Sequence, residues 1–135
     1  GLGRDRILAD ISNRLAELVS DVRDVRVVRD DVRRAFQLIL TTTDGQEFAA
    51  ASLSDGTLRF IALSVLECDT HASGLFCLEE PENGIHPERM GAMMRLLADM
   101  ATDVKEAVSD DNPLQQVIVS THSPIVVAHT PAFFL

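Results

Sequence analysis

The first part of the chain carries a helical hydrophobic pattern that gives way to strand-like segments. Apolar side chains fall on one helical face over residues 5–20, which predicts an amphipathic helix. Residues 25–28 could form a short strand, and residues 34–42 are typical of a longer one. The pair Asp44-Gly45 indicates a hairpin, because the favoured two-residue turn needs positive φ at both central residues. Residues 46–51 are then expected to form the returning strand.

The second part alternates helix-like and strand-like patterns. Apolar positions over residues 58–66 recur with helical spacing, whereas residues 75–78 are wholly apolar, as in a strand buried on both faces. A helix is expected to begin at Pro87 and to carry an apolar stripe as far as Val108, with its methionines packed in the core. A second buried run covers residues 117–119. Two strands joined by a helix favour parallel pairing and an α/β fold, with helices flanking the parallel core strands.

Length and composition bound the class of protein. The 135 residues, 46% of them hydrophobic, allow one folded domain or part of one, with a substantial core. No stretch approaches the ~20 consecutive apolar residues of a membrane span, so no membrane partner is expected. The start of the chain has no secretory leader pattern, which makes the cytoplasm the expected compartment. Cys68 and Cys77 are too few for a disulfide framework and lack metal-ligand spacing.

Charge is unevenly distributed along the chain, whose net charge is −9. Residues 1–34 hold eight arginines and seven acidic residues, so they read as a solvated face of mixed sign. Residues 35–135 are strongly acidic, which argues against direct binding of nucleic acid. The only lysine, Lys105, does not stand in a Gly-Lys-Ser/Thr sequence, so the chain contains no P-loop.

Three short segments are candidates for chemistry, and the first is Leu-Ser-Asp-Gly-Thr at residues 53–57. It directly precedes a predicted helix, whose N-terminus presents unpaired N–H groups and the positive end of the dipole. Gly56 would let a phosphate approach the backbone, and Ser54 offers a hydroxyl. The alternative is an ordinary helix N-cap at Ser54 or Asp55. Asp55 would repel a phosphate unless its side chain points away.

The second segment places carboxylates directly after the buried strand at residues 75–78. Glu79, Glu80 and Glu82 follow that strand, where α/β proteins bind ligands. Because adjacent strand residues face opposite sides, one of the first two carboxylates could hold a metal ion while the other faces a reacting water. The alternative is a strand that simply runs out into an acidic, solvated loop.

The third segment is Ser-Thr-His-Ser-Pro at residues 120–124, after the second buried strand. His122 could contact a γ-phosphate or position a water molecule, although a histidine in such a place can also be purely structural. The three segments occur in an order and at intervals that fit one helix per crossover. Together they are more specific than any one of them alone.

These segments resemble the C-terminal half of an ABC-type ATPase head, in the SMC/RecF/OLD branch with its AAA-like predicted ATPases. Residues 53–57 resemble the signature motif, and residues 75–80 resemble Walker B. Residues 81–87, which include Asn83, are similar to the D-loop, and residues 121–124 are similar to the switch histidine loop. The resemblance covers about residues 36–127.

The resemblance implies ATP and Mg²⁺ as cofactors. It puts Glu79 at the metal-binding position, where an aspartate is usual, and makes Glu80 and His122 the catalytic residues for the nucleotide of the same head. ATP in such heads is held between two subunits. Ser54, Asp55 and Gly56 would therefore face a nucleotide bound by a second head in a homodimer, with Asn83 beside it.

The resemblance also implies that the motifs are divided between two lobes of the head. Walker A would belong to the head's own N-terminal lobe, so residues 1–135 are expected to be a C-terminal lobe that hydrolyses almost no ATP alone. Within it, residues 1–51 would form a helix and hairpin region and residues 52–135 the core with the three motifs. The apolar residues 132–135 are expected to begin a further strand of a longer protein. DNA is a conceivable partner of that protein, but this acidic chain does not support DNA contact.

Two other functions remain open from the sequence. A degenerate ATPase lobe could serve as a non-catalytic dimerisation or interaction module, which Asp55 in the signature and Glu79 in Walker B weakly favour. A phosphatase or nuclease metal site could use Glu79, Glu80 and Glu82, although no His/Asp ligand set with suitable spacing accompanies them.

Overall fold

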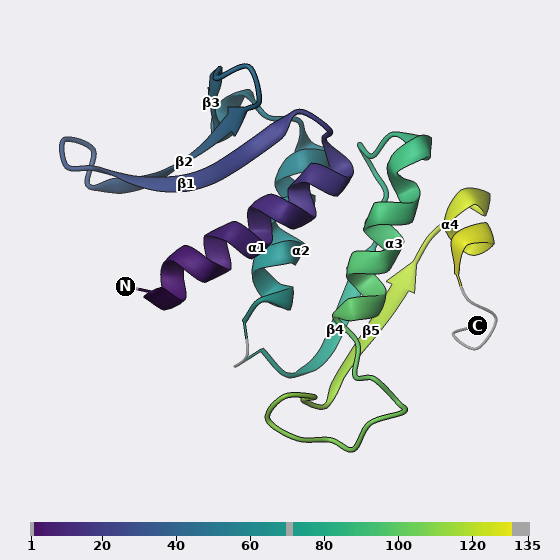
Figure 1. The fold of residues 1–135 in the computed structure, drawn as a ribbon. Coiled ribbons are helices and arrows are strands. Elements are labelled where there is room, and N and C mark those ends of the chain that lie inside the picture. The colour runs from purple at the N-terminus through teal and green to yellow at the C-terminus, as the bar shows by residue number, and fades with distance from the viewer. Residues whose placement is uncertain (1, 70–71, 131–135) are drawn as a thin grey trace.

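The computed structural model describes residues 2–69 and 72–130 (Figure 1). A helix and an antiparallel sheet come first, and a parallel strand pair with its helices follows. The elements in chain order are α1 (Leu2–Leu18), β1 (Val22–Asp30), β2 (Ala35–Thr42), β3 (Glu47–Ala49), the 3₁₀ turn η1 (Ala50–Ser52), α2 (Asp55–Glu67), β4 (Gly74–Glu79), the 3₁₀ turn η2 (Pro87–Arg89), α3 (Met90–Asp99), β5 (Gln115–Ser120) and α4 (Pro124–His129). The strand predicted at residues 132–135 lies outside the described residues.

The antiparallel sheet has the order β1-β2-β3, and β1 and β2 form a long hairpin that projects beside α1 (Figure 1). Val25 pairs with Leu40 in the register, and both are buried. The Val25 N–H also donates to the Ser12 hydroxyl, which ties the hairpin to α1. The returning strand is shorter than predicted, because the chain leaves the sheet at Ala49 and enters the turn η1.

The turn at Asp44-Gly45 differs from the predicted one in its backbone. Only Gly45 has positive φ, at +83°, whereas Asp44 does not. The Gly45 N–H donates to the Thr42 carbonyl, and the Thr42 N–H donates to the Gln46 carbonyl. A hydrogen bond from the Thr42 hydroxyl, together with one from the Gln46 N–H, lowers the pKa of Asp44. The aspartate side chain thus braces a longer loop in which glycine alone needs the left-handed conformation.

The parallel pair confirms the predicted α/β fold. β4 and β5 pair in parallel, with Phe76 opposite Val117 and Leu78 opposite Val119. These four side chains are partly buried and pack against the core. The core also contains Met93, which is fully buried in α3. The helix expected between the two strands is therefore present and packs as predicted.

The prediction that the strand at residues 75–78 is buried on both faces is wrong for this chain. Leu75 is 56% exposed, Cys77 is exposed, and Ile118 on β5 is 56% exposed. These residues alternate with the core-facing ones, so they share the second face of the sheet. We call Leu75, Cys77 and Ile118 the open sheet face. The buried core lies against the opposite face.

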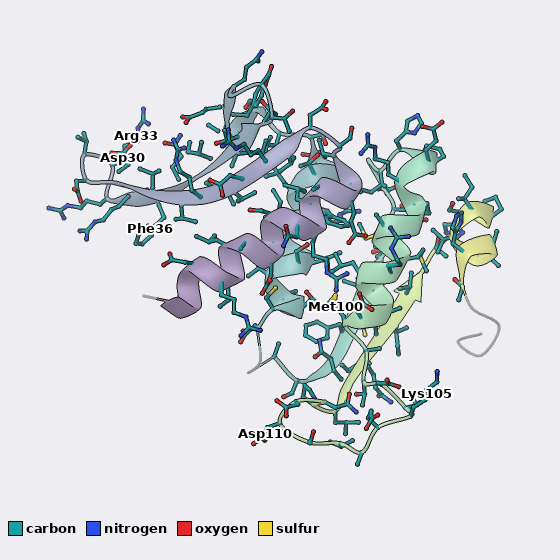
Figure 2. All side chains as sticks on the ribbon, in the orientation of Figure 1. Asp30, Arg33, Phe36, Met100, Lys105 and Asp110 are labelled. Atoms are coloured by element: carbon teal, nitrogen blue, oxygen red, sulfur yellow. The ribbon has the colours of Figure 1, made fainter. Side chains whose placement is uncertain are left out.

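The helix predicted to reach Val108 ends at Asp99. Beyond it, the Asn112 side chain accepts a hydrogen bond from the Asp103 N–H and donates to the carbonyls of Asp103 and Glu106. Local side-chain bonds of this kind compete with helical backbone bonds. Val104 is consequently 85% exposed on the loop that also carries Lys105 and Asp110 (Figure 2).

One core joins the N-terminal region to the α/β region. Its most deeply buried large side chains come from α1, β1, α2 and α3 (Leu15, Val25, Phe60, Met93 and Leu96). At the margin of this core, Arg14 of α1 contacts Glu67 at 3.0 Å and Asp99 at 2.6 Å. Burial acts to lower the pKa of Arg14, but hydrogen bonds to Glu67 and Asp99 leave it raised. These ion pairs tie α1 to the last turns of α2 and α3.

A backbone contact between two glycines joins α2 to the loop that follows β4. A Cβ atom at Gly56 would lie 2.2 Å from the Gly84 carbonyl oxygen. Gly84 has φ of +80°, and a Cβ there would lie 2.9 Å from the Gly56 nitrogen. Both positions therefore require glycine for close approach, and Gly84 also for its conformation. The contact holds the first turn of α2 against residues 81–86.

This contact predicts opposite effects for two helical Gly→Ala substitutions. Gly56→Ala forces the new Cβ into backbone and is expected to lower the free energy of unfolding by about 1–3 kcal/mol. Gly91→Ala in α3 meets only the flexible end of Arg95 at 3.5 Å, so it is expected to be neutral or to stabilise by up to about 1 kcal/mol. Urea denaturation of both variants measures the difference. Equal effects would contradict the role given to the contact.

Candidate functional site

The carboxyl ends of the two parallel strands meet at one edge of the sheet. Glu79 lies opposite Ser120 in the register, and the Glu80 N–H donates to the Ser120 carbonyl at 2.8 Å. The loops that begin at Glu80 and Thr121 therefore leave the sheet side by side. This is the edge at which open α/β sheets bind ligands.

Glu80 has an uncommon backbone conformation, with φ of +43°. For a non-glycine residue such a conformation costs on the order of 1–2 kcal/mol. Three contacts hold it in place: Arg59 Nη1 donates to the Glu80 carbonyl at 2.6 Å, the Asn83 N–H donates to the same carbonyl at 3.0 Å, and Asn83 Nδ2 donates to Glu80 Oε2 at 2.7 Å. The chain thus turns sharply out of the sheet, and the Glu80 carboxylate is fixed by Asn83.

Glu79 and Glu80 have different surroundings. Glu79 is the last residue of β4 and is exposed, and its side chain makes no hydrogen bond or ion pair with other described residues. By alternation its side chain belongs to the open sheet face. Glu80 is half-buried and bonded to Asn83. One carboxylate is therefore free for an external ligand, while the other is held in a defined position.

Glu82 is bonded to the neighbouring loop. Its Oε1 accepts a hydrogen bond from the Thr121 hydroxyl, and its Oε2 is buried with no hydrogen-bond partner in the described part of the chain. Within residues 2–69 and 72–130, no three His, Cys, Asp or Glu side chains form a group that could hold a metal ion. Glu79, Glu80 and Glu82 therefore do not form such a group among the described residues.

His122 projects from the loop after β5. The residue is exposed, and its ring has no hydrogen-bond partner within the described ranges. Its neighbours are better fixed, because the Ser123 N–H donates to the Thr121 hydroxyl oxygen at 2.9 Å. The histidine is therefore held by its backbone at the same sheet edge as Glu80, with its ring available to a ligand.

The segment at residues 54–56 forms the start of α2. Ser54 is the N-cap, and its hydroxyl oxygen accepts a hydrogen bond from the Thr57 N–H at 3.2 Å. Asp55 is the first helical residue and is exposed, whereas Gly56 is buried against Gly84. The capping alternative considered for this segment is thus present in the structure. Ser54 and Asp55 still lie exposed at the helix N-terminus, beside the loop that contains Asn83.

Three residues at this edge were not singled out from the sequence: Arg59, Gly84 and Thr121. Arg59 is five positions after Ser54 on α2, and only the fold shows that its guanidinium reaches the Glu80 carbonyl. Thr121 could have been noticed as the hydroxyl between a strand end and His122. Gly84 could have been noticed as a glycine in a tight loop after Pro81.

No helix in the described residues is long and apolar enough to cross a membrane.

The family model "AAA domain, putative AbiEii toxin, Type IV TA system" matches residues 2–128. No curated protein matches the chain.

Solved structures show a similar fold at low sequence identity. A chain solved in work on ATP-driven dimerization and DNA-stimulated activation of SMC ATPases has 13% identity and a TM-score of 0.64, over 93% of this chain and 73% of that chain. The Pyrococcus furiosus Smc head domain with an extended coiled coil, bound to the C-terminal domain of ScpA, has 10% identity and a TM-score of 0.63, over 94% and 30%. The Thermotoga maritima SMC head domain has 14% identity and a TM-score of 0.55, over 93% and 41%.

These likenesses fit the resemblance inferred from the sequence. The chain spans less than half the length of the Pyrococcus furiosus and Thermotoga maritima chains. Because the identities are low, the solved structures establish the fold alone, which is that of an SMC-type ATPase head. The family match covers nearly the whole chain, and the protein therefore belongs to the AAA domain family described as "AAA domain, putative AbiEii toxin, Type IV TA system".

Proposed function

We propose that the chain is the C-terminal lobe of an ABC-type ATPase head, which binds and hydrolyses ATP together with a lobe that carries Walker A. The observation that supports this most is the shared sheet edge, where Glu79, Glu80 and the His122 loop lie side by side. The start of α2 is held against the same loop by the Gly56–Gly84 contact. The proposal is supported by this chain of contacts, in which the loop after β4 links the strand ends to the start of α2.

Each carboxylate at this edge has surroundings that fit its proposed role. The Glu79 side chain is an exposed oxygen donor with no hydrogen bond or ion pair to other described residues, which suits a ligand of Mg²⁺. Glu80 is oriented by Asn83 and would accept the proton of the attacking water. His122 would contact the γ-phosphate through its free ring. Catalysis of phosphoryl transfer is mainly positioning and charge stabilisation, and these residues would supply the positioning.

A second ATPase head is the proposed partner. Ser54, Asp55 and Gly56 form a helix N-terminus beside Asn83, at a surface that a nucleotide held by another head could meet. ATP-driven dimerization and DNA-stimulated activation are described for the SMC ATPase that has this fold. We propose an ATP-sandwiched homodimer for the longer protein. DNA contact by this chain has no support from its net charge of −9.

The open sheet face is the proposed contact with the N-terminal lobe. Leu75 and Ile118 are each 56% exposed on it, and such apolar strand faces are normally covered by a further layer.

We propose the division into a helix and hairpin region over residues 1–51 and a motif-bearing core over residues 52–135. Location in the cytoplasm stays a prediction.

A non-catalytic lobe is the second candidate, and the start of α2 favours it. Ser54 caps the helix and Gly56 packs on Gly84, so both residues have structural roles that need no nucleotide. Asp55 adds a negative charge at that surface. A degenerate lobe of this kind would act as a dimerisation or interaction module.

Titration calorimetry with Mg-ATP on the complete protein separates the two candidates. An ATPase is expected to bind with a measurable heat and a stoichiometry of one nucleotide per head. The same titration without Mg²⁺ serves as the control and is expected to show weaker binding, because Glu79 would then lack its ion. No heat of binding in either titration would favour the non-catalytic module.

Replacing the proposed base tests the catalytic assignment. Glu80→Gln in the complete protein keeps the bond from Asn83 to a side-chain oxygen but cannot take a proton from water. We expect kcat to fall roughly 10²–10⁴-fold while ATP binding persists, so that an ATP-bound dimer accumulates on size-exclusion chromatography. Glu88→Gln is the matched control, since the Glu88 side chain is 88% exposed, and should leave turnover unchanged. Turnover of Glu80→Gln at the wild-type rate would remove Glu80 from this role.

Cysteine modification tests the proposed lobe contact. Cys77 lies on the open sheet face, so in the complete protein it should react with iodoacetamide at pH 8 at least tenfold more slowly than a cysteine introduced as Val104→Cys. Cys68 should be slow as well, because burial and the neighbouring Glu67 raise its pKa to about 11 and leave little thiolate at that pH. Mass spectrometry of each peptide reports the three rates. Rapid modification of Cys77 would mean that no lobe covers this face.

A further inference from the structure

Glu82 is enclosed in the structure but has no part in the proposed chemistry. It lies three residues beyond the end of β4, and one oxygen of its carboxylate accepts a hydrogen bond from the Thr121 hydroxyl. The other oxygen is buried and has no partner in the described part of the chain. Leaving a buried acceptor unsatisfied costs stability. Stability alone would therefore favour an apolar side chain at position 82, or a carboxylate with both oxygens exposed to water.

The Glu82–Thr121 bond joins the two loops beyond the point where strand pairing stops. The last backbone bond between the strand ends runs from the Glu80 N–H to the Ser120 carbonyl. Past that bond the two segments of the chain separate, one as residues 81–86 and the other as residues 121–124. The contact between the Glu82 and Thr121 side chains is the next tie between them.

Thr121 passes this constraint on to the residues around His122. Its hydroxyl donates to Glu82 and at the same time accepts the Ser123 N–H at 2.9 Å. Ser123 is the N-cap position of α4 and makes no side-chain cap bond of its own. His122 thus stands between two residues that share one hydroxyl, while its own ring is unbonded to other described residues. The Thr121 hydroxyl thus contacts the backbone on the far side of His122, at Ser123.

We propose that Glu82 is a positioning residue, which acts through Thr121 to fix the His122 loop relative to the strand end that carries Glu80. This inference rests on the proposed ATPase function, and it assigns Glu82 a role in that reaction without contact to substrate. The carboxylate holds Thr121 by accepting a hydrogen bond from its hydroxyl, so the role needs an acceptor at position 82 and a hydroxyl at position 121. It does not need a negative charge.

Steady-state ATP hydrolysis by the complete protein tests the proposal with near-isosteric variants. Thr121→Val removes the hydroxyl and Glu82→Met removes the acceptor, and each should lower kcat roughly tenfold to hundredfold, because small misplacements of a reacting group have effects of that size. KM for ATP should stay within about twofold. Thr121→Ser and Glu82→Gln retain the donor and the acceptor, so both should keep most of the wild-type kcat. Thermal melts followed by circular dichroism verify that each variant is folded.

A His122→Ala background distinguishes positioning from a general structural role. If Glu82 acts through His122, then Glu82→Met in that background causes no further loss of kcat, whereas independent effects would multiply. Multiplying losses, or a Thr121→Val enzyme with wild-type kcat, would overturn the proposal. A wild-type protein that hydrolyses no ATP would overturn the proposed function itself. Unaffected variants of an active wild type would remove only the role of Glu82.

Discussion

The contact between the backbones of Gly56 and Gly84 is the constraint on which the arrangement of the candidate site depends. Strand pairing by itself brings together only Glu79, Glu80 and the segment after Ser120. The N-terminus of α2 is far away in sequence, and no strand carries it to the sheet edge. It is joined to the loop that follows β4 because a residue without a side chain lets the first turn of the helix rest on the Gly84 carbonyl oxygen.

A second feature of the loop is the backbone turn that precedes that contact. Between the end of β4 and Gly84 the chain turns at Glu80, which has a positive φ. The strain is balanced by bonds that reach its carbonyl from both sides, one from Arg59 of α2 and one from Asn83 of the loop. Helix α2 thus supports the same turn twice, by a backbone contact and by a guanidinium. Strained backbone that is held from several directions is typical of functional positions.

Local patterns predicted much of the fold. Hydrophobic periodicity located α1, α2 and both parallel strands, since each buries a face whose spacing is set by its own backbone. The sequence also predicted that Glu79, Glu80 and His122 follow two parallel strands, and such strands present their carboxyl ends together.

Contacts between residues far apart in the sequence could not be predicted from those local patterns. The apolar spacing of Val104 and Val108 continued the helical stripe, but the Asn112 side chain draws that backbone into a loop. Gly56 was interpreted as a phosphate contact, and the fold shows a second reason for it in Gly84, 28 positions further on. The apolar run from Leu75 suggested burial on both faces. Burial of the second face depends on which elements pack against it, and a local pattern does not contain that information.

The charges at the sheet edge set a condition on nucleotide binding. Asp55, Glu79, Glu80 and Glu82 all approach this edge or its loop, and ATP would add further negative charge. The positive groups described nearby are already engaged, since Arg59 donates to the Glu80 carbonyl and Arg89 donates to the Leu18 carbonyl. Lys105 lies on the loop that enters the opposite end of β5 (Figure 2).

Arg59 and Arg89 keep their charge while they donate to these carbonyls, but the four carboxylates outnumber them, so a nucleotide at this edge would need further cations, as a metal ion or as basic side chains of another segment. In the proposed function, Glu79 would bind the metal ion and Glu80, whose carbonyl accepts from Arg59 of α2, would orient a water. The positive charge would come from Mg²⁺ or from basic side chains of another segment. Nucleotide binding at such a site would depend on that cation, because the carboxylates that repel a bare nucleotide attract Mg²⁺.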